Sequence, residues 1–186
     1  MNIPPEFKPF GKIPRLSKEC IITEKLDGTN AQLYITEDGE LYTGSRNRWI
    51  TPEDDNYGFA KWAAGNKDAL LTLGPGHHYG EWWGNGIQRG YNMKQKVFSM
   101  FNTERWKDKE LPAGVKLVPV IFSGTFTSAA VGKSMELLKE LGSFASDGFF
   151  NPEGVIIFHK AGNYLFKKTF ENDDSGKGSM GHEVSN

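Results

Sequence analysis

The stretch IITEKLDGTNAQLYI, residues 21–35, contains two runs rich in β-branched and apolar residues, joined by a short polar segment. Both runs have the composition of β-strands. The joining segment contains Lys25, Asp27 and Gly28, and a glycine permits a sharp turn with close backbone approach to a ligand. If the first strand continued, Lys25 and Asp27 would lie on the same face of it. We therefore expect a strand, a turn that carries a cation and a carboxylate, and a second strand.

Similar runs recur along the chain, and turn signals such as EDG and NPEG separate several of them. Residues 55–71 and 127–142 instead have helical apolar spacing, the second with Ser128 as the expected cap and Gly142 as the expected stop. Most connections are too short for crossover helices, which predicts an α+β fold with mostly antiparallel sheets and a few packed helices. The expected strands span residues 20–26, 30–36, 40–45, 77–83, 96–102, 115–122, 153–159 and 163–170.

The 186 residues are 38% hydrophobic, enough for one compact domain with a sizeable core. We expect this domain to span residues 1–170. Residues 171–186 are polar and aperiodic, which predicts a flexible tail with no accessory domain after it. The formal net charge of -1 excludes the basic surface of a nucleic-acid coat protein, so any polyanion must be bound locally.

The single cysteine excludes an internal disulfide and suits a reducing compartment. No apolar run approaches the roughly 20 residues that span a bilayer. The first residues lack the apolar core of a signal peptide. We therefore expect a cytoplasmic protein with no membrane partner, located in the host cytoplasm if the gene belongs to a phage.

Three motif-like features have simpler structural explanations. The segment VGKS, residues 131–134, resembles the end of a phosphate-binding loop, but Thr127 stands where that motif requires a glycine. His77 and His78 would point to opposite faces of a strand and are poorly placed to chelate one ion together. Cys20 opens an apolar strand, so we expect a buried, inert thiol.

Taken alone, the turn at Lys25 has two interpretations. A lysine amine is a nucleophile only when neutral, and at the reference pKa of about 10.4 roughly 1 in 2,500 amines is neutral at pH 7. A nucleophilic lysine therefore needs partial burial and nearby cations, and it suits a phosphate beside a carboxylate-held metal. The alternative is a solvated Lys-Asp pair before a turn. By themselves, the four residues from Lys25 to Gly28 favour the solvated pair.

The remaining motifs change this balance. KLDGTN resembles the nucleophile motif of the covalent nucleotidyltransferases, the superfamily of ATP-dependent ligases and mRNA capping enzymes. Five further segments resemble, in order, its arginine, ribose-binding, base-stacking, metal-associated and phosphate-binding segments. They are TGSRNRW, YGEWWG followed by GNGIQ, KVFSMFN, PEGVIIF and YLFKKTF. Order and spacing agree over about residues 5–171. The Thr-Asn pair after Gly28 is typical of RNA ligases, so the chain resembles the catalytic domain of phage-type, ATP-dependent RNA ligases.

This resemblance implies the nucleotidyltransferase (ATP-grasp-like) domain of ligases, with ATP as co-substrate, Mg²⁺ or Mn²⁺, and RNA 5′-phosphate and 3′-hydroxyl ends as partners. Lys25 would form lysyl-AMP, the AMP would pass to the RNA 5′-phosphate, and the 3′-hydroxyl would displace it. The implied roles are metal binding for Asp27 and Glu153, adenine contact for Glu24, ribose contact for Glu81, base stacking for Phe101, phosphate contact for Lys167 and Lys168, ribose or 5′-phosphate contact for Arg46, and orientation of the acceptor end for Asn30.

The last strand departs from the family pattern. Related enzymes often carry two lysines separated by one residue, whereas Lys167 and Lys168 are adjacent and Thr169 occupies the second position. A regular strand would turn Lys168 away from the nucleotide, and a bulge would redirect it. The cation that contacts the leaving pyrophosphate therefore stays open.

Several alternatives also stay open. The chain could be a minimal ATP-dependent DNA ligase, a cap-type guanylyltransferase, or a nucleotide- or RNA-end-binding module without turnover. Most ligases of the superfamily append a further domain, so a protein partner or the RNA fold is expected to supply grip. RGYNMKQK, residues 89–96, is either an RNA-contact loop or a plain solvated one. Phe101 could be ordinary core, and Arg46, Arg48 and Lys96 could be a solvated surface.

Overall fold

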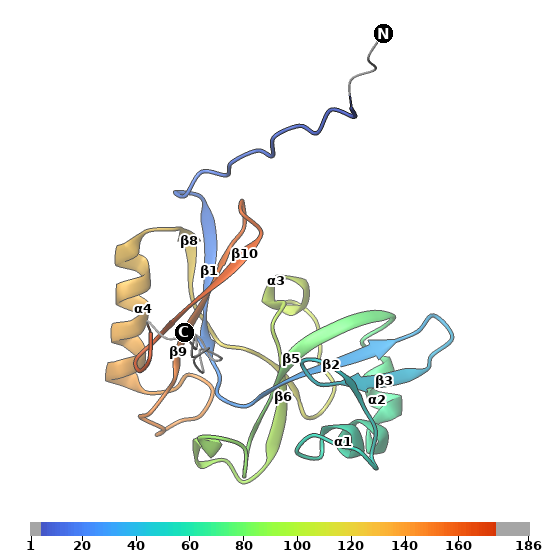
Figure 1. Ribbon diagram of the computed structural model, residues 1–186. Coiled ribbons are helices and arrows are strands. Elements are labelled where there is room, and N and C mark those ends of the chain that lie inside the picture. The colour runs from blue at the N-terminus through green and yellow to red at the C-terminus, as the bar shows by residue number, and fades with distance from the viewer. Residues whose placement is uncertain (1–4, 174–186) are drawn as a thin grey trace, which may run out of the picture.

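The computed structural model describes residues 5–173, which form two β-sheets with helices packed on them (Figure 1). The strands are β1 (Glu19–Lys25), β2 (Thr29–Ile35), β3 (Leu41–Gly44), β4 (Trp49–Ile50), β5 (Gly76–Gly84), β6 (Lys96–Met100), β7 (Val115–Leu117), β8 (Val120–Thr125), β9 (Gly154–His159) and β10 (Tyr164–Thr169). The helices are α1 (Phe59–Gly65), α2 (Lys67–Leu71), α3 (Thr103–Trp106), α4 (Ser128–Leu141) and the 3-10 turn η1 (Gly90–Asn92).

The smaller sheet has four strands in the order β10-β9-β1-β8, and all of its neighbours are antiparallel. Helix α4 covers one face of this sheet, where Met135 and Leu138 pack against Cys20, Ile22 and residues of β9. Burial also raises the pKa of the Cys20 thiol, as expected of an inert thiol. The VGKS segment lies inside α4 and forms no phosphate loop.

The larger sheet has six strands in the order β4-β3-β2-β5-β6-β7, with one parallel pair, β6 and β7. Alternation along β2 sends Ala31, Leu33 and Ile35 into a core with residues of α1 and α2. The opposite face of the sheet therefore carries Asn30, Gln32 and Tyr34. His77 and His78 point to opposite faces of β5, as predicted, with His78 buried and His77 exposed.

The chain crosses between the two sheets at the KLDG turn. Residues 26–28 lead from β1 in the smaller sheet to β2 in the larger one, and residues 118–119 lead back from β7 to β8. A third apolar cluster lies at these crossings and includes Leu26, Trp83, Tyr91, Val118 and Phe149. We call it the junction cluster. It fixes the end of β1, which carries Lys25, against the larger sheet.

The close packing at this crossing explains Gly28. A Cβ on this residue would overlap the carbonyl oxygen of Trp82 and the Cβ of Trp83. The sequence predicted that the glycine allows close approach to a ligand, whereas the close approach observed is to strand β5. Any larger residue would push the KLDG turn away from β5.

The α+β class and the mostly antiparallel pairing are confirmed, but local details differ. The strand expected over residues 115–122 is two strands in different sheets, because Pro119 has no N–H for a continuous ladder. Thr127 rather than Ser128 caps α4, since its hydroxyl accepts from the Ala130 N–H at 3.0 Å. Gly142 ends α4 as predicted, with a φ of 80°. The helix expected over residues 55–71 begins at Phe59 and is broken at Asn66.

Residues 5–18 are exposed, and the first part of this segment extends away from both sheets (Figure 1). Its end lies against the smaller sheet, where His159 Nε2 of β9 is 2.7 Å from the Leu16 carbonyl oxygen. Within residues 5–173, no helix has both the length and the apolar character to cross a bilayer. Most of the predicted flexible tail, residues 174–186, lies outside the described residues. The boundary between domain and tail therefore stays a prediction.

Candidate functional site

Lys25 lies at the end of β1, where the two sheets meet. Its partner in the ladder is Gly154, the first residue of β9. This register places Glu153 beside the lysine, and Lys25 Nζ donates to Glu153 Oε2 at 2.6 Å. Both side chains are largely enclosed, with exposed fractions of 18% and 10%. Two residues that are 128 positions apart thus form a short, shielded ion pair.

Glu81 lies on the neighbouring strand β5 and faces the same turn. Its carboxylate accepts from the Gly28 N–H at 3.1 Å and from Asn30 Nδ2 at 2.9 Å. Burial raises the pKa of Glu81 to about 7, although these two hydrogen bonds and the charge of Lys25 act in the opposite direction. Glu81 can therefore gain or lose a proton near neutral pH.

Asp27 is held by a brace that the sequence did not predict. Its Oδ2 accepts from Arg89 Nε at 3.0 Å, and its N–H donates to the Tyr91 hydroxyl at 2.8 Å. Arg89 also donates to the backbone and side-chain oxygens of Asn151, each at 3.0 Å. One guanidinium therefore joins the KLDG turn to the segment that leads into Glu153.

This brace corrects the interpretation of residues 89–96. Either interpretation of this loop, as an RNA contact or as a plain solvated segment, would leave the Tyr91 ring exposed, but the ring is fully buried against Trp83 and Phe149. Lys96 donates to the Tyr57 carbonyl at 2.7 Å. The sequence offers no local signal for the brace, because Asp27 and Arg89 are 62 residues apart.

Glu24 is buried behind the turn. Its Oε2 accepts from the N–H groups of Phe144 and Ala145, at 2.8 and 3.2 Å. Its Oε1 is also buried and makes no hydrogen bond within the described residues. Burial raises the pKa of this carboxyl above its ordinary value, and hydrogen bonds from Ser143, Phe144 and Ala145 offset only part of the rise. A buried acceptor without a donor fits a further donor such as an exocyclic amino group.

A cavity of about 430 Å³ opens on the face of the larger sheet that carries Asn30, the residue that Glu81 holds. Neither Lys25 nor any of these carboxylates is among the described residues that line it. Asn30, Arg46 and Phe101 all line it, and Leu165 of β10 closes it from the other sheet. Phe101 is 43% exposed, so its interpretation as ordinary core is wrong. Arg48, in contrast, is an exposed residue paired with Asp54. The fold thus brings three of the predicted ligand-contacting residues to one cavity.

The two lysines of β10 face different ways. Strand β10 pairs with β9 without a bulge, so Lys167 lies opposite Ile156 and Lys168 opposite Val155. Val155 belongs to the core under α4, which places Lys168 on that side of the sheet. Lys168 Nζ donates to Asp173 Oδ2 at 2.9 Å. Lys167 shares a face with Leu165 of the cavity, and the structure does not bring Lys168 to that face.

The predicted metal ligands, Asp27 and Glu153, are each paired with a cation. Across residues 5–173, no group of three or more His, Cys, Asp and Glu residues gathers to hold an ion. Carboxylate oxygens nevertheless suit Mg²⁺, which usually takes one or two protein ligands plus phosphate oxygens and water. The donor set fits an ion that arrives with a nucleotide, not one held by the protein alone.

Comparison with known proteins identifies the fold. Three solved structures of Naegleria gruberi RNA ligase variants superimpose on 82–83% of this chain: a complex with ATP and Mn (TM-score 0.58), a complex with AMP and Mn (TM-score 0.56) and an apo form (TM-score 0.57), each 20% identical in sequence. This chain spans about half of their length, 50% in each case. No curated protein matches the sequence. The sequence profile of the RNA ligase family matches residues 18–171, and the chain therefore belongs to the RNA ligase family.

Proposed function

We propose that this chain is the adenylyltransferase domain of an ATP-dependent RNA ligase and that Lys25 is its nucleophile. The observation that carries the proposal is the shielded contact between Lys25 Nζ and Glu153 Oε2, at 2.6 Å, beside the buried carboxyl of Glu81. An amine and two carboxyls from three distant segments meet where the two sheets join. A solvated Lys-Asp pair would need none of this enclosure.

In the first step, neutral Lys25 Nζ attacks the α-phosphorus of ATP in line with the pyrophosphate. The N–P bond forms as the bond from the α-phosphorus to the bridging oxygen breaks, and pyrophosphate leaves. Glu153 Oε2, at 2.6 Å, would accept the proton that the ammonium must first lose. Lys167, on the cavity face of β10, would neutralise charge on the α-phosphate oxygens.

The later steps join two RNA ends. An oxygen of the RNA 5′-phosphate attacks the lysyl-AMP phosphorus, the P–N bond breaks, and the lysine regains a proton. The 3′-hydroxyl then attacks the 5′-phosphate phosphorus, loses its proton, and displaces AMP. We assign Arg46, in the cavity, to the 5′-phosphate or ribose, and Asn30, which Glu81 holds, to the acceptor end.

The remaining residues position the nucleotide. Glu81 would accept from the ribose hydroxyls, Glu24 Oε1 from the adenine amino group, and the exposed ring of Phe101 would stack on the base. Asp27 and Glu153 would hold Mg²⁺ or Mn²⁺ directly or through water, and the ion would neutralise phosphate charge. A protein partner, a further domain or the RNA fold would supply additional grip on the ends.

The test is mass spectrometry of the protein after incubation with ATP and Mg²⁺ or Mn²⁺. We expect one added AMP, labile to acid, on the peptide that contains Lys25, and no addition in Lys25→Ala. Phosphate addition elsewhere, or AMP on another residue, contradicts the assignment. A chase with 5′-phosphorylated RNA should release the AMP and yield joined product.

The same assay separates the alternatives. A cap-type enzyme would take label from GTP instead of ATP, and a DNA ligase would pass AMP to nicked DNA in preference to RNA. A binding module without turnover would bind ATP and RNA but never gain AMP. Stable transfer of label from ATP to RNA ends excludes all three.

A further inference from the structure

The solvent-facing side of the six-stranded sheet carries a row of aromatic rings. The strand register places Tyr34 opposite both Tyr42 and His77, and Gln32 opposite Tyr79. Trp49 lies opposite Gly44, in the next strand pair. These rings therefore share one face, the face opposite the core under α1 and α2. We call Tyr34, Tyr42, Trp49, His77 and Tyr79 the aromatic strip.

The rings of the strip contact one another and remain open to solvent. Tyr34 and His77 stack with centroids 4.4 Å apart, and His77 and Tyr79 are nearly parallel at 5.5 Å. Trp49 lies 6.2 Å from Tyr34 and 6.1 Å from Tyr42. Tyr42, Trp49 and Tyr79 are 51%, 53% and 54% exposed. Contiguous exposed rings of this kind mark an interaction site more often than a plain surface.

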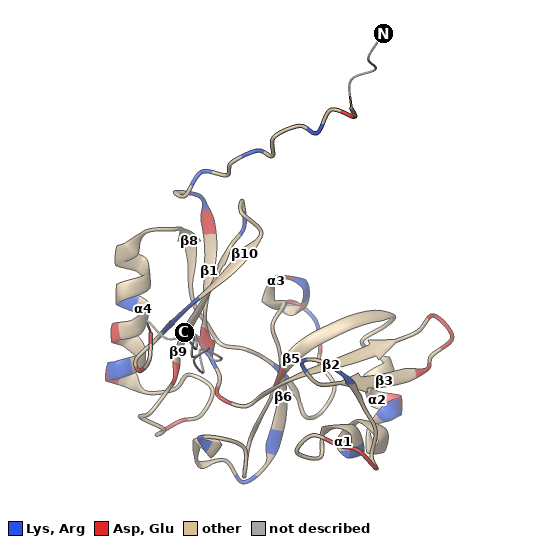
Figure 2. Ribbon diagram, viewed as in Figure 1, with Lys and Arg blue, Asp and Glu red and all other residues tan. Residues whose placement is uncertain are grey.

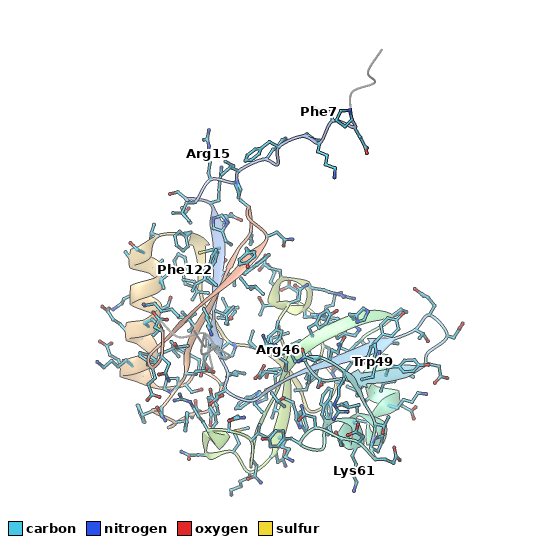
Figure 3. All side chains as sticks on the ribbon, viewed as in Figure 1. Phe7, Arg15, Arg46, Trp49, Lys61 and Phe122 are labelled. Atoms are coloured by element: carbon cyan, nitrogen blue, oxygen red, sulfur yellow. The ribbon has the colours of Figure 1, made fainter. Side chains whose placement is uncertain are left out.

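The strip leads into the cavity of the candidate site. His77 and Tyr79 line that cavity together with Asn30, Arg46 and Arg105. Figure 3 labels Arg46 near the space between the two sheets and Trp49 farther along the larger sheet. Beyond the strip, the β2–β3 turn is acidic, whereas α3 carries Arg105 (Figure 2). The described residues that line the cavity at this end of the strip include Arg46 and Arg105 and no carboxylate, and Glu104 of α3 is paired with Lys160.

We propose that the aromatic strip is a stacking surface for unpaired bases of the RNA strand that enters the site, with Arg46 and Arg105 contacting its phosphates. The proposal deepens the function proposed above and rests on it for the identity of the substrate as RNA. Every base has an aromatic face, so stacking holds a single strand without selecting its sequence. A duplex keeps its bases paired and stacked internally, and cannot use the strip in this way.

A protein partner fits these features less well. The rings carry hydroxyl, imidazole and indole N–H groups instead of forming an aliphatic groove, and cations stand at one end. The surface is also continuous with the cavity that contains Asn30 and Arg46, where the RNA end is proposed to react. Single-stranded RNA accounts for all three features: the exposed rings, the arginines at one end, and the continuity with the cavity.

The test compares binding of a 5′-phosphorylated oligouridylate and of a blunt RNA duplex by fluorescence anisotropy. Trp49→Ala and Tyr42→Ala should each weaken binding of the single strand about 5- to 100-fold and leave duplex binding unchanged. Trp49→Phe, which keeps a stacking ring, should bind like wild type. Phe150→Ala, which removes a 67% exposed ring outside the strip, should also bind like wild type.

The positive end of the strip has its own readout. Arg105→Gln should reduce the slope of log Kd against log salt by about 0.7, the contribution of one phosphate contact in a single strand. Unchanged single-strand binding in Trp49→Ala and Tyr42→Ala would overturn the proposal. Equal losses for single strand and duplex would overturn it too, because stacking would then not be the cause.

This outcome is separable from that of the proposed function. Binding requires no turnover, and lysyl-AMP formation is measured without RNA. Trp49→Ala should form lysyl-AMP at the wild-type rate, because Trp49, unlike His77 and Tyr79, is not among the described residues that line the cavity. If lysyl-AMP never forms but the strip variants lose single-strand binding, the ligase mechanism fails and the RNA surface stands. If lysyl-AMP forms and those variants bind RNA normally, the surface fails and the mechanism stands.

Discussion

Glu81 is a buried carboxyl that both holds its neighbours in place and has a raised pKa. Its carboxyl fixes two neighbours of the nucleophile turn, the Gly28 N–H and the Asn30 side chain. Its burial would be costly without these donors, and even with them the pKa rises to about 7. The protein therefore holds, at the candidate site, a carboxyl whose pKa burial raises toward neutrality. A ribose hydroxyl that donates to it would favour the charged form.

This raised pKa predicts how stability depends on pH. In the unfolded chain Glu81 ionises near pH 4.5, and in the folded protein near 7. Between these values the folded state binds more protons, so the free energy of unfolding falls as pH rises from about 4.5 to 7. The total loss is about 3 kcal/mol, from the difference between the two pKa values.

Glu81→Gln should remove this loss. The glutamine carbonyl can still accept from Gly28, and a flipped Asn30 amide can accept from its NH₂ group. In urea unfolding of the nucleotide-free protein, the variant should gain about 2 to 3 kcal/mol over wild type at pH 8 and little at pH 4.5. An equal difference at both pH values would show that the effect is not the titration of Glu81.

Strand β10 provides a matched pair of lysines. Because the strand has no bulge, Lys167 shares the cavity face and Lys168 lies on the side of α4. Lys167→Ala should slow lysyl-AMP formation on the order of 100-fold, as for loss of a preorganised donor to developing charge. Lys168→Ala should slow it less than about 3-fold. Initial rates with labelled ATP measure both effects. A larger loss in Lys168→Ala than in Lys167→Ala would contradict the conclusion that the lysine on the cavity face contacts the phosphate.

The Arg89 brace joins the loop after β5 to the KLDG turn and to the segment that leads into Glu153. Arg89→Met removes its bonds to Asp27 and Asn151 and leaves a partly buried carboxylate without its cation. We expect a loss of about 1 to 3 kcal/mol in the free energy of unfolding and slower lysyl-AMP formation. Arg89→Lys should restore only part of both, since an ammonium cannot bond in the same planar geometry.

The control for this brace is Arg48→Met, which removes an exposed pair with Asp54. That change should cost about 0 to 1 kcal/mol and leave the rate of lysyl-AMP formation unchanged. If Arg89→Met behaves like Arg48→Met, the brace does not hold the site together.

The elements that the sequence predicted are those with a strong local pattern. Strands β1, β2, β9 and β10 have apolar and β-branched runs that alternate or lie between turn signals, and each was predicted to within one residue at either end. Local pattern could not reveal that Pro119 sends two consecutive strands to different sheets. It also could not distinguish the Tyr91 ring from an exposed one, because partners such as Phe149 are distant in sequence.

The candidate site divides in the same way. The residues inferred from motif order, such as Lys25, Glu153 and Glu81, do converge. Arg89 and Asn151, which hold Asp27 and the segment before Glu153 in place, stood in the sequence only as members of the RGYNMKQK loop and the NPEG turn signal, and neither pattern indicated this role. Their role depends on side-chain geometry between segments, which a single sequence does not encode locally. The aromatic strip is an intermediate case. The sequence shows its aromatic residues, but only the strand register shows that they share one face of the sheet.

The described residues form two sheets, one covered by α4 and the other by α1 and α2, each with its own apolar core and joined by the junction cluster. Lys25 belongs to one sheet and Glu81 to the other, so their relative position depends on this third cluster. Loss of packing in a sheet core should lower stability without moving the two residues apart. Loss of packing in the junction cluster should do both.

A matched pair of substitutions tests this argument. Phe149→Leu reduces packing in the junction cluster, and Phe59→Leu reduces it in the core of the larger sheet, where Phe59 is fully buried. Each should cost roughly 1 to 3 kcal/mol in urea unfolding. At a temperature where both variants remain folded, only Phe149→Leu should slow lysyl-AMP formation, by about 10-fold, because a small displacement at a reacting group is costly. Equal rates in the two variants would mean that either sheet alone positions the nucleophile and that the junction cluster contributes stability only.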